Sequence, residues 1–342
     1  MTNARFQNAL RREPQAVPPI WFMRQAGRYH RHYQALRAKH TFMELCKNAE
    51  LAAEVAMGPI EDFDFDVAIL FSDLLFPLEA MGMGLSYDPA PTLSWHLTPE
   101  TVTRLRPWQE ALPGLAFQRD AMVRTRARLP RGKSLIGFVG GPWTLFAYAV
   151  EGAHKGGLAP SKRHLPLFGP FCQRLLPLLE RNVELQLEGG AEVVMLFDTA
   201  AGELSPGVYL EAIPEKLERL ARAFPGRLGY YAKGITEAHL QHRLFRAGSP
   251  LVGLGLDHRW DLPARLAEAP FGFLQGNFDQ SLLFMETAGF EREARRYFDG
   301  FHALSLEARA GWVCGLGHGV LPGTPEAHVR RFVQMAREAF SP

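Results

Sequence analysis

The 342-residue sequence contains little cysteine and no metal-binding motif. Its three cysteines, Cys46, Cys172 and Cys314, are far apart and odd in number, which argues against a disulfide framework and for a reducing compartment, so we expect a cytoplasmic protein. Neither H-E-x-x-H nor C-x-x-C occurs, and no cysteine has a histidine at zinc-site spacing. We therefore expect no bound metal.

The sequence also lacks a long apolar run and a strong net charge. The longest uncharged stretch, residues 134–150, is interrupted by Gly140-Gly141-Pro142, and the first residues lack the apolar core of a secretory signal. We expect neither a membrane segment nor a targeting signal. The net charge of +2 gives no general attraction to nucleic acid or to anionic membranes, so we expect neither as a partner.

Short apolar runs recur along the chain with helical stretches between them. Because they are continuously apolar, they are typical of parallel strands buried on both faces. Helix signals separate them: Ser205-Pro206 and Thr324-Pro325-Glu326 resemble helix starts, and Gly189-Gly190 resembles a helix stop. The eight runs are residues 19–23, 67–71, 134–139, 192–197, 227–232, 250–256, 271–276 and 311–316.

Eight such β/α units predict an α/β protein built as a single-domain (β/α)8 TIM barrel over residues 1–342. The connection around residues 86–133 is too long for one barrel unit, and we interpret it as an inserted helical segment. A doubly wound open sheet is the alternative architecture. In a barrel the active site lies at the carboxyl ends of the strands, so the residues just after each run are the candidates.

The first run is followed by a basic turn, Arg24-Gln25-Ala26-Gly27-Arg28. Residues 14–43 contain no aspartate or glutamate, so this region should attract anions. The planar fork of arginine suits carboxylates and phosphates, and Arg24 and Arg28 could converge on one polyanion. The alternatives are a solvated basic loop or a nucleic-acid patch.

The second run is followed by Ser72-Asp73, with apolar residues on both sides. A carboxylate in such surroundings must find hydrogen-bond donors. Asp73 is either a helix cap or a carboxylate held at the barrel mouth to stabilise positive charge.

Three other strand ends carry polar candidates. Tyr148 lies on the helix after the third run, on the same face as Thr144, and is either a core residue or a pocket residue. Thr199 follows the fourth run and could equally form a turn. His318, in Gly-Leu-Gly-His-Gly after the last run, could bind a carboxylate as the protonated imidazole, and this glycine-rich turn could instead bind phosphate.

Two longer motifs resemble the signatures of the uroporphyrinogen decarboxylase family: PPIWFMRQAGRYHRHY at residues 18–33 and GFVGGPWTLFAYAVEG at residues 137–152. The similarity continues in family order through ILFSDLLFP, MLFDTAAGELSP, YYAKG, LQGN and GLGHGVLPGTP. It thus extends over nearly the whole chain.

This resemblance implies a carboxy-lyase of haem biosynthesis that converts uroporphyrinogen to coproporphyrinogen in an α/β barrel. It also implies a homodimer that uses no cofactor. Two positions depart from the usual pattern: Ala200 replaces a larger side chain, and His258 stands where tryptophan is frequent. The resemblance assigns catalytic roles to Asp73, Arg24, Arg28, Tyr148 and His318, and substrate contacts to these residues and to Gln25, Phe197 and Thr199.

Two other functions are compatible with parts of the sequence. A related barrel methyltransferase would use a zinc thiolate, but its expected His-x-Cys motif is absent. A non-catalytic polyanion-binding protein would explain the basic turn but gives Asp73 no role.

Overall fold

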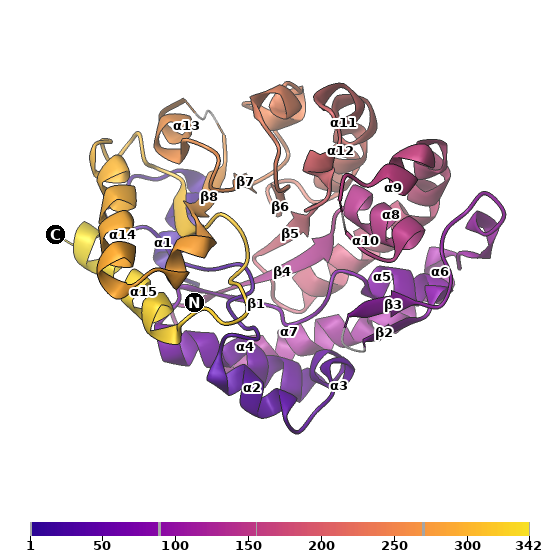
Figure 1. The fold of residues 1–342 in the computed structure, drawn as a ribbon, viewed down its shortest axis with the longest axis horizontal. Helices are drawn as coiled ribbons and strands as arrows, with labels where there is room; N and C mark the ends of the chain where they lie inside the picture. The colour runs from indigo at the N-terminus through magenta and orange to yellow at the C-terminus, as the bar shows by residue number, and fades with distance from the viewer. Residues whose placement is uncertain (1, 88–89, 155, 269–270, 342) are drawn as a thin grey trace.

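The computed structural model describes residues 2–87, 90–154, 156–268 and 271–341. Seven parallel strands form one curved sheet in the order β1-β4-β5-β6-β7-β8-β9 (Figure 1). A separate antiparallel hairpin pairs β2 (Leu85–Tyr87) with β3 (Pro91–Leu93). The strands of the large sheet are β1 (Val67–Ile69), β4 (Ser134–Gly140), β5 (Val193–Phe197), β6 (Leu228–Tyr231), β7 (Gly253–Gly255), β8 (Phe273–Phe278) and β9 (Trp312–Leu316).

The predicted first strand, residues 19–23, is reduced to a bridge that lies between β9 and β1. Ile20 pairs in parallel with Cys314 of β9, and its carbonyl accepts a 2.9 Å hydrogen bond from the amide of Asp66, just before β1. The paired segment is limited to one residue because Pro19 has no amide hydrogen to donate to a neighbouring strand. The segment still joins the two edges, so the (β/α)8 barrel expected from the sequence is confirmed.

Helices surround the sheet on its outer side (Figure 1). α11 begins after Ser205, and α10 ends at Glu188, just before the predicted stop Gly189-Gly190. α15 begins at Glu326 with Pro325 as its cap, one residue later than the sequence indicated. The helices are α1 (Ala4–Arg11), α2 (Arg31–Arg37), α3 (Phe42–Lys47), α4 (Ala49–Phe63), α5 (Phe76–Leu78), α6 (Trp108–Ala111), α7 (Ala116–Arg128), α8 (Pro142–Glu151), α9 (Ala159–Arg163), α10 (Phe168–Glu188), α11 (Pro206–Ala212), α12 (Pro214–Ala223), α13 (Leu262–Glu268), α14 (Thr287–His302) and α15 (Glu326–Phe340).

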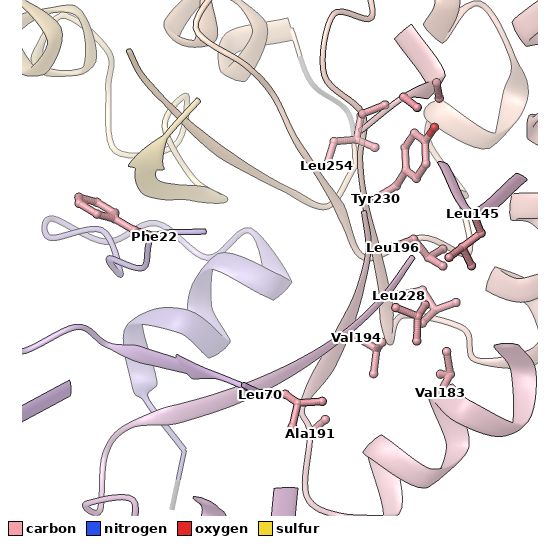
Figure 2. Packing of buried hydrophobic residues seen from close by; sticks show 14 of the residues in the cluster. Phe22, Leu70, Leu145, Val183, Ala191, Val194, Leu196, Leu228, Tyr230 and Leu254 are labelled. Carbon is pink, nitrogen blue, oxygen red and sulfur yellow. The ribbon is translucent and has the colours of Figure 1, made fainter. Parts of the chain in front are cut away.

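The alternation of side chains along each strand produces two separate cores. In β5, Val194 and Leu196 point outward into the layer between sheet and helices, which Figure 2 shows from close by. Val193, Met195 and Phe197 belong instead to the cluster inside the barrel. Phe6 and Ala9 of α1 also belong to the inner cluster. The barrel is therefore filled with side chains, and a ligand can enter only beyond the strand ends.

The connection between β1 and β4 contains α5, the β2–β3 hairpin, α6 and α7. Its helix α7 packs against α4 and α10 on the outside of the barrel. The hairpin instead brings Pro91 to the cavity described below. No helix in the described part of the chain is long and apolar enough to cross a membrane.

Candidate active site

One cavity lies at the carboxyl ends of the barrel strands. It collects six of the residues expected from the sequence: Arg24, Asp73, Tyr148, Phe197, Thr199 and His318. These residues come from five separate β/α units, so the barrel topology brings them together. The remaining lining is mostly apolar and consists of Met23, Ala26, Ile69, Leu70, Phe71, Ser72, Leu74, Leu75, Pro91 and Phe138.

Arg24 has a left-handed backbone with a φ of 59°, an uncommon conformation for a residue with a side chain. Its side-chain stem lies against Gly319, where an added Cβ would be 2.5 Å from Cδ of Arg24. No acidic group in the described part of the chain lies within salt-bridge distance of its guanidinium. This leaves Arg24 a free cation at the cavity, suited to an incoming carboxylate.

The other two polar residues of the basic turn do not line the cavity. Gln25 is buried, and its side-chain amide accepts from the amide of Phe22 at 3.2 Å and donates to the carbonyl of Val67 at 3.1 Å. Both contacts tie the turn to the barrel wall, so Gln25 supports the turn from behind. Arg28 is exposed outside the lining, and its contact with substrate remains a prediction.

Asp73 is held at the start of the short turn that leads into α5. Its Oδ1 accepts a 2.9 Å hydrogen bond from the amide of Leu75, two residues along the chain. Leu75 is the N-cap of α5 and the helix has no side-chain cap, so Asp73 stabilises the turn before the helix and is not the helix cap considered from the sequence. The side chain also lines the cavity, so this turn contact is compatible with a contact to substrate. Burial raises the pKa of Asp73, while the Leu75 amide and the Arg24 guanidinium oppose the shift.

Tyr148 and Thr199 are positioned by one hydrogen-bonded clamp between β5 and α8. Oδ1 of the buried Asp198 accepts from the amide of Thr144 at 2.6 Å, and the hydroxyl of Thr144 accepts from the amide of Ala200 at 3.0 Å. Thr199 lies between the two clamped residues, and Tyr148 lies one turn beyond Thr144 on α8. The backbones that carry the hydroxyls of Tyr148 and Thr199 are therefore fixed relative to each other.

The phenol of Tyr148 is a hydrogen-bond donor in this site. Burial and the nearby Asp73 carboxylate raise the pKa of Tyr148, so it keeps its proton. Burial also raises the pKa of Asp198 to about 6.

The surroundings of His318 favour the neutral imidazole, so its binding of a carboxylate as the protonated form stays a prediction. Burial lowers the pKa of His318 to about 3, and the positive charges of Arg24 and Lys233 contribute to this shift. The sequence showed the glycines around this residue but not that two cations lie near it. The imidazole thus offers a neutral N–H donor or an acceptor to a ligand.

The apolar wall was mostly missed by the sequence reasoning. The rings of Phe138 and Phe197 lie 5.5 Å apart on neighbouring strands and face the cavity together. The sequence did contain a signal for part of this wall. Ile69 and Phe71 are two residues apart in the same run, the spacing of residues that face the same side of a strand. Nothing in the local sequence indicated that Pro91 of the hairpin completes this wall.

The two departures noted in the sequence lie outside the lining. Ala200 is fully buried and contributes its amide to the clamp. His258 lies with its Nε2 3.9 Å from Oδ2 of Asp279. An added Cβ on Gly317 would lie 2.5 Å from the amide nitrogen of His258, so that glycine lets the two strand-end loops approach closely.

The fold and this cavity define an α/β-barrel protein with a largely apolar cavity, lined by Arg24 and Asp73, at the carboxyl ends of its strands. Residues 1–339 match the sequence profile of uroporphyrinogen decarboxylase (URO-D). The chain therefore belongs to the uroporphyrinogen decarboxylase family. A uroporphyrinogen decarboxylase of Thermus thermophilus is 34% identical to it, with 99% of this chain and 98% of the relative covered. That of Edwardsiella ictaluri is 37% identical, with 97% and 96% covered.

Solved structures with low sequence identity share the fold. A methyltransferase from Methanosarcina mazei superposes with a TM-score of 0.79 at 19% identity, and 99% of each chain is covered. A putative vitamin-B12-independent methionine synthase from Listeria monocytogenes gives a TM-score of 0.57 at 10% identity, with 96% of this chain and 99% of that chain covered. These similarities establish the barrel and carry no information on the reaction.

Proposed function

We propose that this protein is a carboxy-lyase that converts the four acetate side chains of uroporphyrinogen III to methyl groups, giving coproporphyrinogen III and CO₂ in haem biosynthesis. The observation that carries the proposal is the pairing of a free cation, Arg24, with a half-buried carboxylate, Asp73, on one largely apolar cavity. A reduced tetrapyrrole carries carboxylates at its rim and pyrrole N–H groups at its centre. The two charged residues match these two features of the substrate.

Arg24 binds a substrate carboxylate in this proposal. Its guanidinium has no acidic partner in the described residues, so binding a carboxylate does not first require breaking an ion pair. The neutral His318 and the phenol of Tyr148 offer hydrogen bonds to neighbouring carboxylates. Arg28 would act at the outer edge of the same site.

The reaction needs a place for the electrons released when the acetate loses CO₂. The substrate's own pyrrole supplies it: protonation of the α carbon next to the ring carbon that bears the acetate gives an iminium-like cation conjugated with that carbon. Loss of CO₂ moves the bonding pair into this cation and leaves an exocyclic alkene. A second protonation forms the methyl group, and loss of the ring proton restores the pyrrole, so the net change is one proton consumed and one CO₂ released. The substrate thus provides the electron sink that an organic cofactor provides in other decarboxylases.

Asp73 faces the pyrrole N–H groups and stabilises the positive charge that develops on the protonated ring. Because the carboxylate is half-buried and already fixed by the amide of Leu75, little reorganisation is needed as the charge develops. A guanidinium, with a pKa above roughly 12, is a poor acid. We therefore assign the proton to solvent or to a substrate carboxyl group held by Arg24.

We also propose that the protein acts in the cytoplasm as a homodimer, without metal or organic cofactor. The proposal is supported by the family resemblance and by the few, separated cysteines. Light scattering at micromolar concentration is expected to give about twice the chain mass of 38.3 kDa. Activity after dialysis against a strong chelator should equal that of the untreated protein.

The proposal is tested by incubating the protein anaerobically with chemically reduced uroporphyrinogen III. The products are oxidised and separated by chromatography. Intermediates with seven, six and five carboxylates, followed by coproporphyrin, are expected to appear in sequence. A protein that binds the substrate but releases no CO₂ would overturn the proposal and favour a non-catalytic polyanion-binding protein.

A further inference from the structure

Tyr87, in the hairpin outside the barrel, lies behind the wall of the cavity. It ends β2 and pairs across the hairpin with Pro91, which lines the cavity. Its ring packs against Phe42 with centroids 4.6 Å apart, and Phe42 packs against Phe71 of the cavity wall at 6.0 Å. Contacts on two sides therefore hold the phenol in place.

The hydroxyl of Tyr87 is buried and makes no hydrogen bond of ordinary geometry with any described residue. A buried hydroxyl without a partner is costly, so its presence calls for an explanation. The side chain beside it is the carboxylate of Asp73. Burial and this carboxylate raise the pKa of Tyr87, so the phenol keeps its proton and can act only as a donor toward Asp73.

The other groups around Asp73 do not supply this donor. Arg24 acts on Asp73 through its charge, and Tyr148 and the thiol of Cys46 are protonated groups whose pKa values the carboxylate raises. Glu79, the other carboxylate that acts on Tyr87, is engaged by Lys47, with Nζ and Oε1 2.7 Å apart. Among the described residues, the amide of Leu75 alone makes a hydrogen bond of ordinary length to the carboxylate, at 2.9 Å on Oδ1.

We infer that Tyr87 is a positioning residue for Asp73, whose phenolic O–H holds the carboxylate in its ionised form and fixes its direction toward the cavity. The Leu75 amide and the Tyr87 hydroxyl then hold Asp73 from two directions. A carboxylate in an apolar cavity would otherwise tend to take up a proton, and the protonated acid could not stabilise a cationic pyrrole. This inference rests on the proposed function.

The test is the pH profile of kcat/KM for Tyr87→Phe, which removes one oxygen atom and keeps the ring. Loss of a hydrogen bond to a charged group should raise the pH of the acid limb by about one unit. Below that limb the variant should be about tenfold slower than the wild type, and well above it the two should converge. The substrate's own carboxyl groups titrate identically in both assays and cancel from the comparison.

The matched control is Tyr33→Phe, the same deletion in the same aromatic cluster. Tyr33 packs 5.7 Å from Phe71, but its charged neighbours are Arg37 and Arg28 rather than Asp73. Its acid limb should coincide with that of the wild type. In an Asp73→Asn background, Tyr87→Phe should have no further effect on the profile, because the group that it positions is gone.

A Tyr87→Phe profile that superimposes on the wild-type profile would overturn the inference while leaving the proposed function intact. An inactive wild type would instead refute the proposed function. If Tyr87→Phe folds poorly, 3-fluorotyrosine at position 87 provides the second test. Fluorine makes the phenol a stronger donor, so the acid limb should move to lower pH, and an unchanged limb would count against the inference.

Discussion

Gly319 makes the space that the side chain of Arg24 occupies. A Cβ on Gly319 would lie 2.5 Å from Cδ and 2.8 Å from Cγ of Arg24, closer than real atoms approach. The two residues come from opposite ends of the sequence and meet because residues 19–23 lie beside β9. The last glycine of Gly-Leu-Gly-His-Gly is therefore explained by the arginine at the cavity, and no phosphate is needed to explain it.

Gly319→Ala should displace the guanidinium of Arg24 without unfolding the protein. Arg24 is exposed and can move outward, so the melting temperature should change little. Because a displacement of about 1 Å in a site can cost up to roughly 100-fold, kcat/KM should fall by about 10-fold to 100-fold. Gly207→Ala is the control, since an added Cβ there meets no atom within 4 Å. Equal losses in the two variants would contradict this explanation.

The two arginines of the basic turn should affect substrate binding and turnover more than Arg31, which follows the turn. Arg24→Ala should weaken substrate binding and slow turnover, with a cost on the order of 2 to 5 kcal/mol for a charge-assisted pair in a partly buried site. Arg28→Ala should have an effect of the same kind. Arg31→Ala should be close to neutral, because Arg31 is 86% exposed and forms a surface ion pair with Glu326. Steady-state kinetics of the three variants provide the measurement, and equal effects would indicate a diffuse basic patch.

Asp198 should make stability depend on pH in the acid range. Its folded-state pKa of about 6 lies above the ordinary value of 3.8, because burial disfavours the charged carboxylate. The stability that protonated Asp198 contributes is therefore fully present below pH 3.8 and is lost as the pH rises through about 6.

Asp198→Asn should remove this contribution while keeping an oxygen that accepts from the amide of Thr144. Relative to the variant, the wild type should lose a few kcal/mol of unfolding free energy between these two pH values. Urea denaturation of both proteins at several pH values gives the comparison. A difference that stays constant from about pH 4 to about pH 7 would show that Asp198 does not titrate in this range.

The barrel and most of the strand-end residues could be predicted because both depend on patterns local in sequence. Each strand appears as an apolar run, and parallel strands bring the residues that follow them to one end of the barrel. The extent of the first strand was harder to predict. Its residues are apolar like those of the other strands, but Pro18 and Pro19 limit its hydrogen bonding.

What could not be predicted depends on neighbours distant in sequence. The amide of Gln25 faces Val67 because the turn folds back on the barrel wall. The pKa of His318 is lowered by burial and by the charges of Arg24 and Lys233, which come from other strand ends. Tyr87 reaches Asp73 through a hairpin whose position no periodicity indicates. In each case the charge or contact is set by packing between separate β/α units.

Asp73 has two roles, the contact with the Leu75 amide and the proposed stabilisation of a cationic pyrrole, and one substitution can separate them. As the residue that accepts from the Leu75 amide, asparagine serves about as well as aspartate, so Asp73→Asn should fold with a melting temperature close to that of the wild type. As the counter-charge to a protonated pyrrole, asparagine cannot substitute. Turnover should therefore fall by roughly 10² or more, the usual scale for removing one preorganised stabilising group.

Asp73→Glu provides the geometric comparison for this residue. Its added methylene keeps the charge but moves the carboxylate away from the centre that must accept several N–H groups, so turnover should also be low. Ser72→Ala is the neighbouring control, because the hydroxyl of Ser72 accepts a 3.0 Å hydrogen bond from Gln118 and carries no charge. Turnover and thermal unfolding of all three variants should be measured together. Near-normal turnover in Asp73→Asn would show that another group faces the pyrroles, because asparagine preserves only the contact with the Leu75 amide.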